Sequence, residues 1–204
     1  MSKTLSDGPW DQKYPLHNGA REGILDDVVK FIEVKNFSPD EPDGEFLKTP
    51  LMFACLHRRY VIVDYLLRRS DVHVENCTST LWSPLMMAVR EGDLDVAQLI
   101  LEGPQANRVE INGKNHLGQT ALHIAVLFTP RAARLGLLQL LMAHGANPNL
   151  QDSFGKSAIR CATFSSQAAL ANYLIAKTPV PVPQRAQDAK GSRLCYQLSE
   201  KRKP

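Results

Sequence analysis

A tetrapeptide pattern recurs along this chain at a nearly constant interval and constrains the fold more than any other feature. A hydroxyl-bearing residue is followed by Pro or Ala and then by Leu or Ile, at five places that begin with Tyr14, Thr49, Ser83, Thr120 and Ser157. Successive copies start 35, 34, 37 and 37 residues apart. Such a period is typical of repeat proteins, in which no unit buries its apolar face alone and neighbouring units must stack.

Two further features keep the same register in all five copies. A small residue stands three positions after each Leu or Ile, at Gly19, Ala54, Ala88, Ala125 and Ala162. A second apolar cluster follows with the spacing of an amphipathic helix, beginning at Val28, Ile62, Val96, Leu137 and Leu170. Each copy therefore predicts a short helix, a turn and a second helix, and the small residue lets a neighbouring helix approach closely.

The residues at the expected helix ends support this interpretation. Thr or Ser before Pro starts a helix well, because the hydroxyl accepts hydrogen bonds from free backbone N–H groups and Pro lacks a donor that would be unpaired. Thr49 and Ser83 stand in this position. Gly23 and Gly92 follow the first helices of two copies, where glycine allows a tight turn.

These features resemble the ankyrin repeat. The fourth copy is closest to that family's pattern, over residues 115–126 and again over residues 144–149, which spell His-Gly-Ala-Asn-Pro-Asn. The resemblance covers about residues 10–177. It implies an all-α solenoid of helix-turn-helix units joined by hairpin loops, without a sheet.

The resemblance also implies a division of the chain. Five repeats, called copies one to five below, are expected over residues 10–42, 43–77, 78–113, 114–150 and 151–177. Residues 1–9 form an N-terminal extension, and residues 178–204 form a Pro-rich, then basic and polar tail. We expect a flexible tail, with a short nuclear-import or acidic-surface patch as the alternative.

Several positions depart from the family pattern. The hairpin glycine and the histidine after the helix start are replaced in copies two and three, by Leu47, Leu81, Met52 and Met86. Arg58 replaces the mid-repeat glycine of copy two, and about one residue is inserted in copy one before Val28. Extra residues also occur in the loop 102–113 and near 129–135, and we expect such insertions on surface loops.

Composition narrows the class of protein. With 24 Lys and Arg against 21 Asp and Glu, the net charge of +3 lacks the basic excess of a nucleic-acid binder. No apolar run reaches the length of a membrane helix, and the first eleven residues lack the apolar stretch of a secretory signal. The four cysteines lie far apart, which favours free thiols. We expect a cytoplasmic protein, with a nuclear location as the alternative.

The sequence offers little support for catalysis, and we predict a protein that is not an enzyme and needs no cofactor or metal. Motifs for nucleotide loops and metalloproteases are absent from the sequence. His17 and His123 occupy the repeat's histidine position, where the family uses the side chain to hydrogen-bond backbone. His73 and Cys77 have a possible zinc spacing but no further ligands nearby. An enzyme with a deep polar pocket at the loop 102–113 stays as an alternative.

The resemblance implies a partner-binding surface on the hairpins and at the ends of the first helices. The residues predicted to contact a partner are Phe46, Leu56, His57, Trp82, Arg90, Glu91, His116, Leu117, Gln119 and Phe128. Exposed aromatic residues and Arg are enriched at protein interfaces. Trp82 could equally cover the gap between hairpins, and we favour that role for Phe154. For Arg58 and Arg59 we favour a solvated face over a basic patch.

We therefore predict a monomeric scaffold or adaptor that binds another protein through its concave surface, with neither nucleic acid nor a membrane as partner. A preorganised rigid surface lowers the entropy that is lost on binding. The alternative is a regulatory or inhibitory subunit, or a secreted microbial effector that uses the same surface on a host protein.

Overall fold

The computed structural model describes residues 13–165 and 167–178, and helices account for all the regular structure in this part of the chain. The fold class is thus the predicted all-α solenoid. The helices form an inner row, comprising α2 (Pro15–Glu22), α4 (Pro50–Leu56), α6 (Pro84–Glu91), α8 (Ala121–Leu127) and α10 (Ala158–Phe164). The outer row comprises α3 (Leu25–Val29), α5 (Tyr60–Leu67), α7 (Leu94–Glu102), α9 (Arg131–Ala143) and α11 (Ala168–Lys177).

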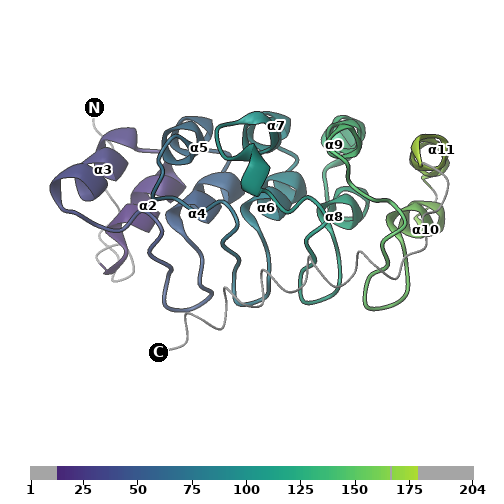
Figure 1. Ribbon diagram of the computed structural model, residues 1–204, viewed down its shortest axis with the longest axis horizontal. Helices are drawn as coiled ribbons and strands as arrows, with labels where there is room; N and C mark the ends of the chain where they lie inside the picture. The colour runs from purple at the N-terminus through teal and green to yellow at the C-terminus, as the bar shows by residue number, and fades with distance from the viewer. Residues whose placement is uncertain (1–12, 166, 179–204) are drawn as a thin grey trace.

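The two rows run side by side along one axis, and the hairpin loops extend from the inner row in a common direction (Figure 1). Each inner helix packs against the next inner helix and against its own outer helix. The predicted unit of two helices and a turn is therefore the unit that stacks. Among the helices that the structure describes, none is long and apolar enough to cross a membrane.

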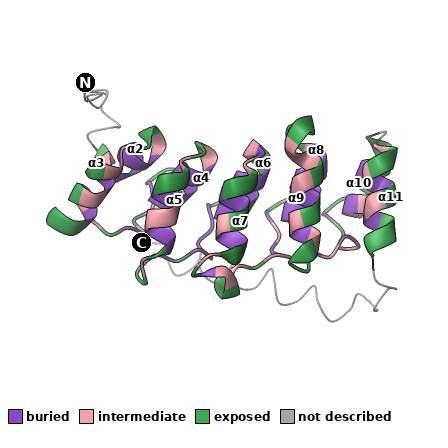
Figure 2. Cartoon of the chain, turned by 90° about the horizontal axis from the view of Figure 1, so that it is seen from above, coloured by how far each residue is buried: buried purple, intermediate pink, exposed green. Residues whose placement is uncertain are grey.

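The core lies between neighbouring copies. The small-residue positions Ala54, Ala88, Ala125 and Ala162 are fully buried. The leucine positions before them are also buried, at Leu16, Leu51, Leu85 and Leu122, while Ile159 in copy five is partly buried. Buried positions occupy the helix sides that face neighbouring copies (Figure 2). Each pair thus covers apolar surface of the next, which is the physical reason for the repeat.

The helix starts confirm the predicted capping. The hydroxyl oxygens of Thr49, Ser83 and Ser157 accept hydrogen bonds from backbone N–H groups in the first turn of α4, α6 and α10. At α8, Thr120 and His123 cap each other's backbone in a reciprocal arrangement. Because these bonds satisfy donors that a helix cannot pair internally, they set where α4, α6, α8 and α10 begin, whereas Tyr14 before α2 makes no side-chain cap.

A polar side chain closes each hairpin from inside. Asn115 Oδ1 accepts hydrogen bonds from the backbone N–H groups of Leu117 and Gln119, at 2.9 and 3.0 Å. Asp43 and Asp152 do the same in their own hairpins. These bonds give the hairpins equivalent shapes.

Backbone hydrogen bonds also join each hairpin to the next. The N–H group of Ser79 donates to the Phe46 carbonyl at 2.9 Å, and that of Ser153 donates to the Leu117 carbonyl at 2.9 Å. The hairpins therefore form one connected edge rather than independent loops.

The replaced glycines keep the glycine conformation. Leu47 and Leu81 have φ of 57° and 60°, and Arg58 has φ of 58°, which are left-handed values that disfavour residues with a Cβ. Gly118 and Gly155 have φ of 72° and 69° at the positions equivalent to the two leucines. Stacking therefore imposes one backbone path on all hairpins, whether or not the local residue favours it.

The insertions do not all lie in loops. The residues near 129–135 were expected between helices, but α9 begins at Arg131 and has 13 residues, so most of them lengthen the outer helix. In copy one the outer helix continues from α3 into a π-helical turn, Lys30–Val34. A π-helical turn contains one residue more than an α-helical turn would, so it can accommodate an inserted residue. The loop 102–113 contains a short 3₁₀ turn, Ala106–Arg108.

Candidate interaction surface

The hairpins and the carboxyl ends of the inner helices meet in copies three and five, where Arg90 lies over Trp82 and Lys156 lies over Phe164. We call the exposed residues of the hairpins and of these helix ends the hairpin surface. The predicted contact residues Phe46 and Phe128 lie on it with 44% and 52% of their area exposed. His57, Arg90 and His116 are also exposed. The remaining predicted residues that reach this surface are partly buried, at Leu56, Trp82, Glu91 and Leu117.

Gln119 is the exception, and its predicted placement on the surface is wrong. Its side chain is 5% exposed, and its Oε1 atom accepts a hydrogen bond from Asn115 Nδ2 at 3.2 Å. Successive side chains of the hairpin point to opposite sides, so the Gln119 side chain points into the protein and supports the turn.

Cationic side chains lie against aromatic rings along the hairpin surface. Lys48 Nζ is 4.6 Å from the centre of the Phe46 ring, and the Arg90 guanidinium is 5.7 Å from that of Trp82. Trp82 is partly buried and packed against the core, so only part of its side chain is exposed on this surface. Cation–π contact holds a long flexible cation in place and partly dehydrates it, which prepares it for a partner.

Copy five carries a similar cluster that the sequence analysis missed. Phe164 at the end of α10 is 66% exposed, and Lys156 and Arg160 approach its ring at 5.5 and 5.6 Å. Phe164 occupies the same repeat position as Arg90, a signal that could have revealed it. Phe154 is 70% exposed, so the role of covering a gap between hairpins, which we favoured for it, is wrong.

The two repeat-position histidines support structure. His17 Nε2 donates to the Glu41 carbonyl at 2.8 Å, and His123 Nε2 donates to the Lys156 carbonyl at 2.9 Å. Each bond runs from an inner helix to the hairpin that follows it. Burial lowers the pKa of both imidazoles below the usual value, which keeps them neutral.

The thiols that the structure describes are poorly suited to nucleophilic chemistry. Cys55, Cys77 and Cys161 are unbridged and buried. Burial raises the pKa of Cys55 and Cys161, which disfavours the reactive thiolate. Cys195 lies outside the described residues.

The spacing of His73 and Cys77 does not form a metal site. His73 Nδ1 pairs with Asp40 at 2.5 Å, and the Cys77 thiol donates to the Glu75 carbonyl at 3.4 Å. In residues 13–165 and 167–178, no group of three potential metal ligands comes together.

Arg58 and Arg59 connect copies; Arg58 is exposed, as expected for the solvated face that we favoured, whereas Arg59 is partly buried. Arg59 Nε donates to the Arg21 carbonyl of copy one at 2.8 Å. Arg58 Nη2 donates to the Gly92 carbonyl of copy three at 3.1 Å, and its Nε lies 3.7 Å from Asp93. Each guanidinium therefore meets the carboxyl end of an inner helix, where carbonyls lack partners and the helix dipole favours positive charge.

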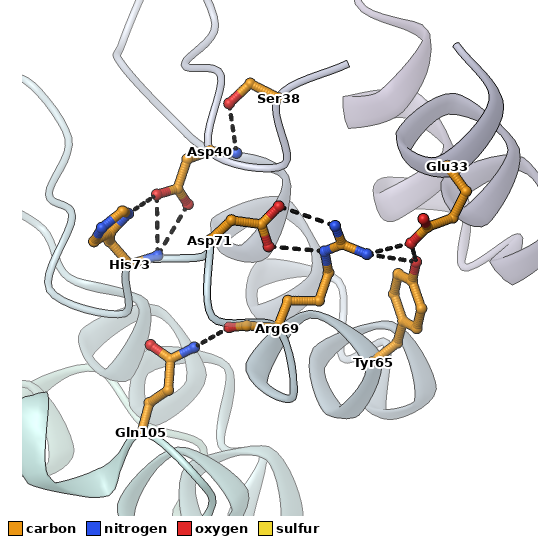
Figure 3. Close-up of polar contacts among 8 residues, drawn as sticks. All are labelled: Glu33, Ser38, Asp40, Tyr65, Arg69, Asp71, His73 and Gln105. Carbon is orange, nitrogen blue, oxygen red and sulfur yellow. Dashed lines mark hydrogen bonds and ion pairs between the residues drawn. The ribbon is translucent and has the colours of Figure 1, made fainter. Parts of the chain in front are cut away.

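A polar network on the side of the outer helices joins copies one to three (Figure 3). Arg69 pairs with Asp71 at 2.9 Å, and it also contacts Glu33 and the Tyr65 hydroxyl. The Arg69 guanidinium lowers the pKa of Asp71. Gln105 Nε2 donates to the Arg69 carbonyl at 2.9 Å and so anchors the loop 102–113. This network stiffens the array and leaves the hairpin surface free.

The loop 102–113 was the expected place for a catalytic pocket. An open hollow of about 490 Å³ borders its first residues and is lined by Tyr60, Asp95, Gln98, Leu99, Glu102 and Gly103. A second cavity of about 20 Å³, which holds about one water molecule, is lined mainly by apolar residues that include Val74, Leu85 and Val109. The larger hollow is polar but open to solvent, whereas the enzymatic alternative predicts a deep pocket.

Comparison with known proteins agrees with this architecture. A sequence model described as ankyrin repeats in three copies matches residues 16–110, and a model of a single ankyrin repeat matches residues 117–153. The chain is 28% identical over 130 residues to YahD of Escherichia coli strain K12, an ankyrin repeat protein by its name, and the match covers 62% of each chain.

Two human relatives match shorter segments. NF-kappa-B inhibitor delta is 33% identical over 91 residues, which cover 44% of this chain and 29% of that protein. The Notch-regulated ankyrin repeat-containing protein is 33% identical over 90 residues, which cover 44% of this chain and 75% of that protein. The chain thus spans less than two thirds of YahD and under a third of the inhibitor.

Proposed function

Because this chain belongs to the ankyrin repeat family, whose repeats generally mediate protein–protein interaction, we propose that it is an adaptor that binds a partner protein through the hairpin surface. The observation that carries the proposal is the exposure of large aromatic side chains on that surface, at Phe46 and Phe128. Exposed aromatic residues cost free energy in water, and that cost is recovered when a partner buries them.

The rigidity of the surface supports the same function. The hairpins are joined by backbone hydrogen bonds, and the polar network around Arg69 stiffens the opposite side. A surface that is ordered before binding loses little entropy when a partner docks. A standard footprint of roughly 800 Å² per partner would extend over about three copies. We place this footprint on copies two to four.

Affinity capture from the native cell, followed by hydrogen–deuterium exchange on the complex, tests this proposal. We expect protection on the hairpins, and weaker capture by the variant that combines Phe46→Ala with Phe128→Ala. The matched control combines Tyr60→Ala with Val61→Ala, two exposed apolar residues of outer helix α5. Protection confined to the outer helices, or equal capture by both variants, would contradict the proposal.

A regulatory or inhibitory subunit is the second candidate. Its support is the similarity to a protein named as an inhibitor, NF-kappa-B inhibitor delta. Activity of the captured partner, measured with and without this chain, distinguishes an inhibitor from an adaptor that only tethers. The third candidate, a secreted microbial effector, is tested by a secretion assay in the source organism.

A further inference from the structure

The part of the hairpin surface contributed by copies three to five has an uneven charge. Arg90, Lys156 and Arg160 are exposed there, and none of the three pairs with a carboxylate in the described part of the chain. Glu91 is a partly buried acidic neighbour, and the Asp152 carboxylate is buried and occupied by backbone N–H groups. The local charge is therefore positive although the whole chain is nearly balanced.

Apolar surface lies between these cations. Phe128 and Phe164 are both more than half exposed, and they close the inner helices of adjacent copies four and five. Trp82 lies beside Arg90, and Phe164 lies beside Lys156 and Arg160. The aromatic rings and the cations thus alternate along neighbouring copies that pack directly on one another.

Copies one and two differ from this half. Arg21 pairs with Glu22, Arg59 is used by a backbone carbonyl, and Arg58 lies near Asp93. Lys48, which lies over the Phe46 ring, is a hairpin-surface cation of this half without an ion pair in the described residues. The other cations named here are neutralised or used within the protein, so copies three to five hold more of the unpaired cations on the hairpin surface.

We infer that the footprint extends to copy five, and that copies three to five bind an acidic segment of the partner, in which Asp or Glu residues stand next to aliphatic or aromatic ones. The inference rests on the proposed function and specifies the chemistry of the partner. Carboxylates meet cations that aromatic rings already hold in position, and the apolar side chains cover Phe128, Phe164 and the exposed part of Trp82. Each partner group therefore finds a complementary group on the surface.

A single-stranded nucleic acid also combines negative charge with flat apolar groups. Copies three to five carry the three unpaired cations Arg90, Lys156 and Arg160 rather than a long basic groove, and the whole chain carries a net charge of only +3. These features favour a peptide, and nucleic-acid binding becomes an outcome of the test.

Selection of random 12-residue peptides, displayed on phage, against the full chain tests the inference. We expect selected peptides enriched in Asp and Glu beside Leu, Phe or Trp. The tightest peptide, measured by fluorescence anisotropy, should bind at least tenfold more weakly to the variant that combines Arg90→Gln, Lys156→Gln and Arg160→Gln. Its affinity should also fall as salt rises, because salt screens charge pairs.

The matched control combines Lys35→Gln, Arg131→Gln and Lys177→Gln, which removes three exposed cations from the outer side. We expect its affinity to stay within twofold of the unmodified protein. Thermal melting of both variants verifies folding, because all six side chains are exposed and their loss should leave the core intact.

Several outcomes would overturn the inference. These are neutral or basic selected peptides, no selected peptide, equal binding by the two triple variants, or tighter binding of a twelve-nucleotide uridine strand than of the peptide. Neutral peptides that bind the hairpin surface and lose affinity with Phe128→Ala would leave the proposed function intact and reject only the acidic partner. Binding confined to the outer helices would reject both.

Discussion

Leu47 and Gly155 occupy equivalent hairpin positions and share a left-handed backbone, with φ of 57° and 69°. A leucine pays for that conformation with a Cβ clash that glycine lacks, and the cost is about 1–2 kcal/mol. The neighbouring hairpins hold Leu47 in place regardless. The stacked array therefore tolerates a local residue that disfavours its own turn.

The substitution Leu47→Gly should raise the free energy of unfolding by about 0.5–1 kcal/mol, because relief of the strained turn outweighs the extra flexibility of the unfolded chain. Gly155→Leu should lower it by about 1 kcal/mol or more for the same reason. A Cβ at residue 155 would meet its nearest atom at 3.9 Å, which is no clash, so this substitution measures the free-energy cost of the left-handed backbone alone. Urea denaturation measures both, and changes of the same sign would contradict the argument.

His17 and His123 make stability depend on pH. Burial lowers the pKa of both imidazoles in the folded protein, so the unfolded chain takes up protons first as pH falls below about 6.5. The free energy of unfolding should therefore be fully present above that pH and fall below it. The pKa of His57 is also lowered by burial and adds an effect in the same direction.

Copies two and three carry Met52 and Met86 at the repeat position of His17 and His123, so Met is a replacement that this fold already accommodates. The double variant His17→Met, His123→Met should be less stable at pH 7.5, because it loses the bonds to the Glu41 and Lys156 carbonyls. Its stability should change less between pH 7.5 and pH 5 than that of the unmodified chain. Chemical denaturation across this range measures the slope, and parallel curves would rule out the histidines as its source.

At the scale of the element, inner helices are held at their ends. Hydroxyl caps set the starts of α4, α6, α8 and α10, and groups from neighbouring copies bind carbonyls at the ends of α2 and α6. Arg59 binds the Arg21 carbonyl at 2.8 Å, and the Thr129 hydroxyl donates to the Val89 carbonyl at 2.6 Å. Because these helices span only two turns, bonds between copies replace stability that a short isolated helix lacks.

The substitution Arg59→Met keeps the apolar stem and removes the guanidinium that joins copies one and two. We expect the free energy of unfolding to fall by about 1 kcal/mol, since a partly exposed charged donor is lost. Arg68→Met is the control, because Arg68 at the end of α5 is exposed and, within the described residues, pairs only with Asp64. If both variants lowered the melting temperature equally, the hydrogen bond from Arg59 between copies would contribute no more to stability than the ion pair of Arg68.

At the scale of the whole molecule, each copy contacts only its neighbours, so a defect in the middle differs from a defect at an end. Ala88 lies fully buried in copy three, and Ala162 lies fully buried in copy five. The two positions are equivalent within the repeat. The place of the substituted copy in the array, rather than its local environment, should therefore decide how many neighbouring copies lose stability.

The substitution Ala88→Arg should lower the free energy of unfolding by roughly 3 kcal/mol or more, because a long charged side chain enters a packed interface. Hydrogen exchange should then speed up on both sides of copy three. Ala162→Arg should free mainly α10 and α11 and leave protected amides in copies one to three. Unchanged melting of the Ala88 variant would contradict the assignment of this position.

The sequence by itself determined the fold. The interval between copies, the buried Leu and Ala positions and the helix starts follow from local chemistry repeated in register. Repetition makes this possible, because each unit meets the same neighbours and one pattern shows the environment of all. The resemblance to the ankyrin repeat added the roles of His17 and His123 and the surface positions of Phe46 and Phe128.

Only the tertiary structure decided which long side chains remain free for a partner. Arg58 and Arg59 are used between copies, Gln119 turns inward, and Phe164 turns outward beside Lys156 and Arg160. The reason is physical: these side chains reach across copies, and whether they meet a carbonyl, a ring or solvent depends on the spacing between helices. A repeat pattern specifies which face a residue occupies, but not what that residue contacts on a neighbouring copy.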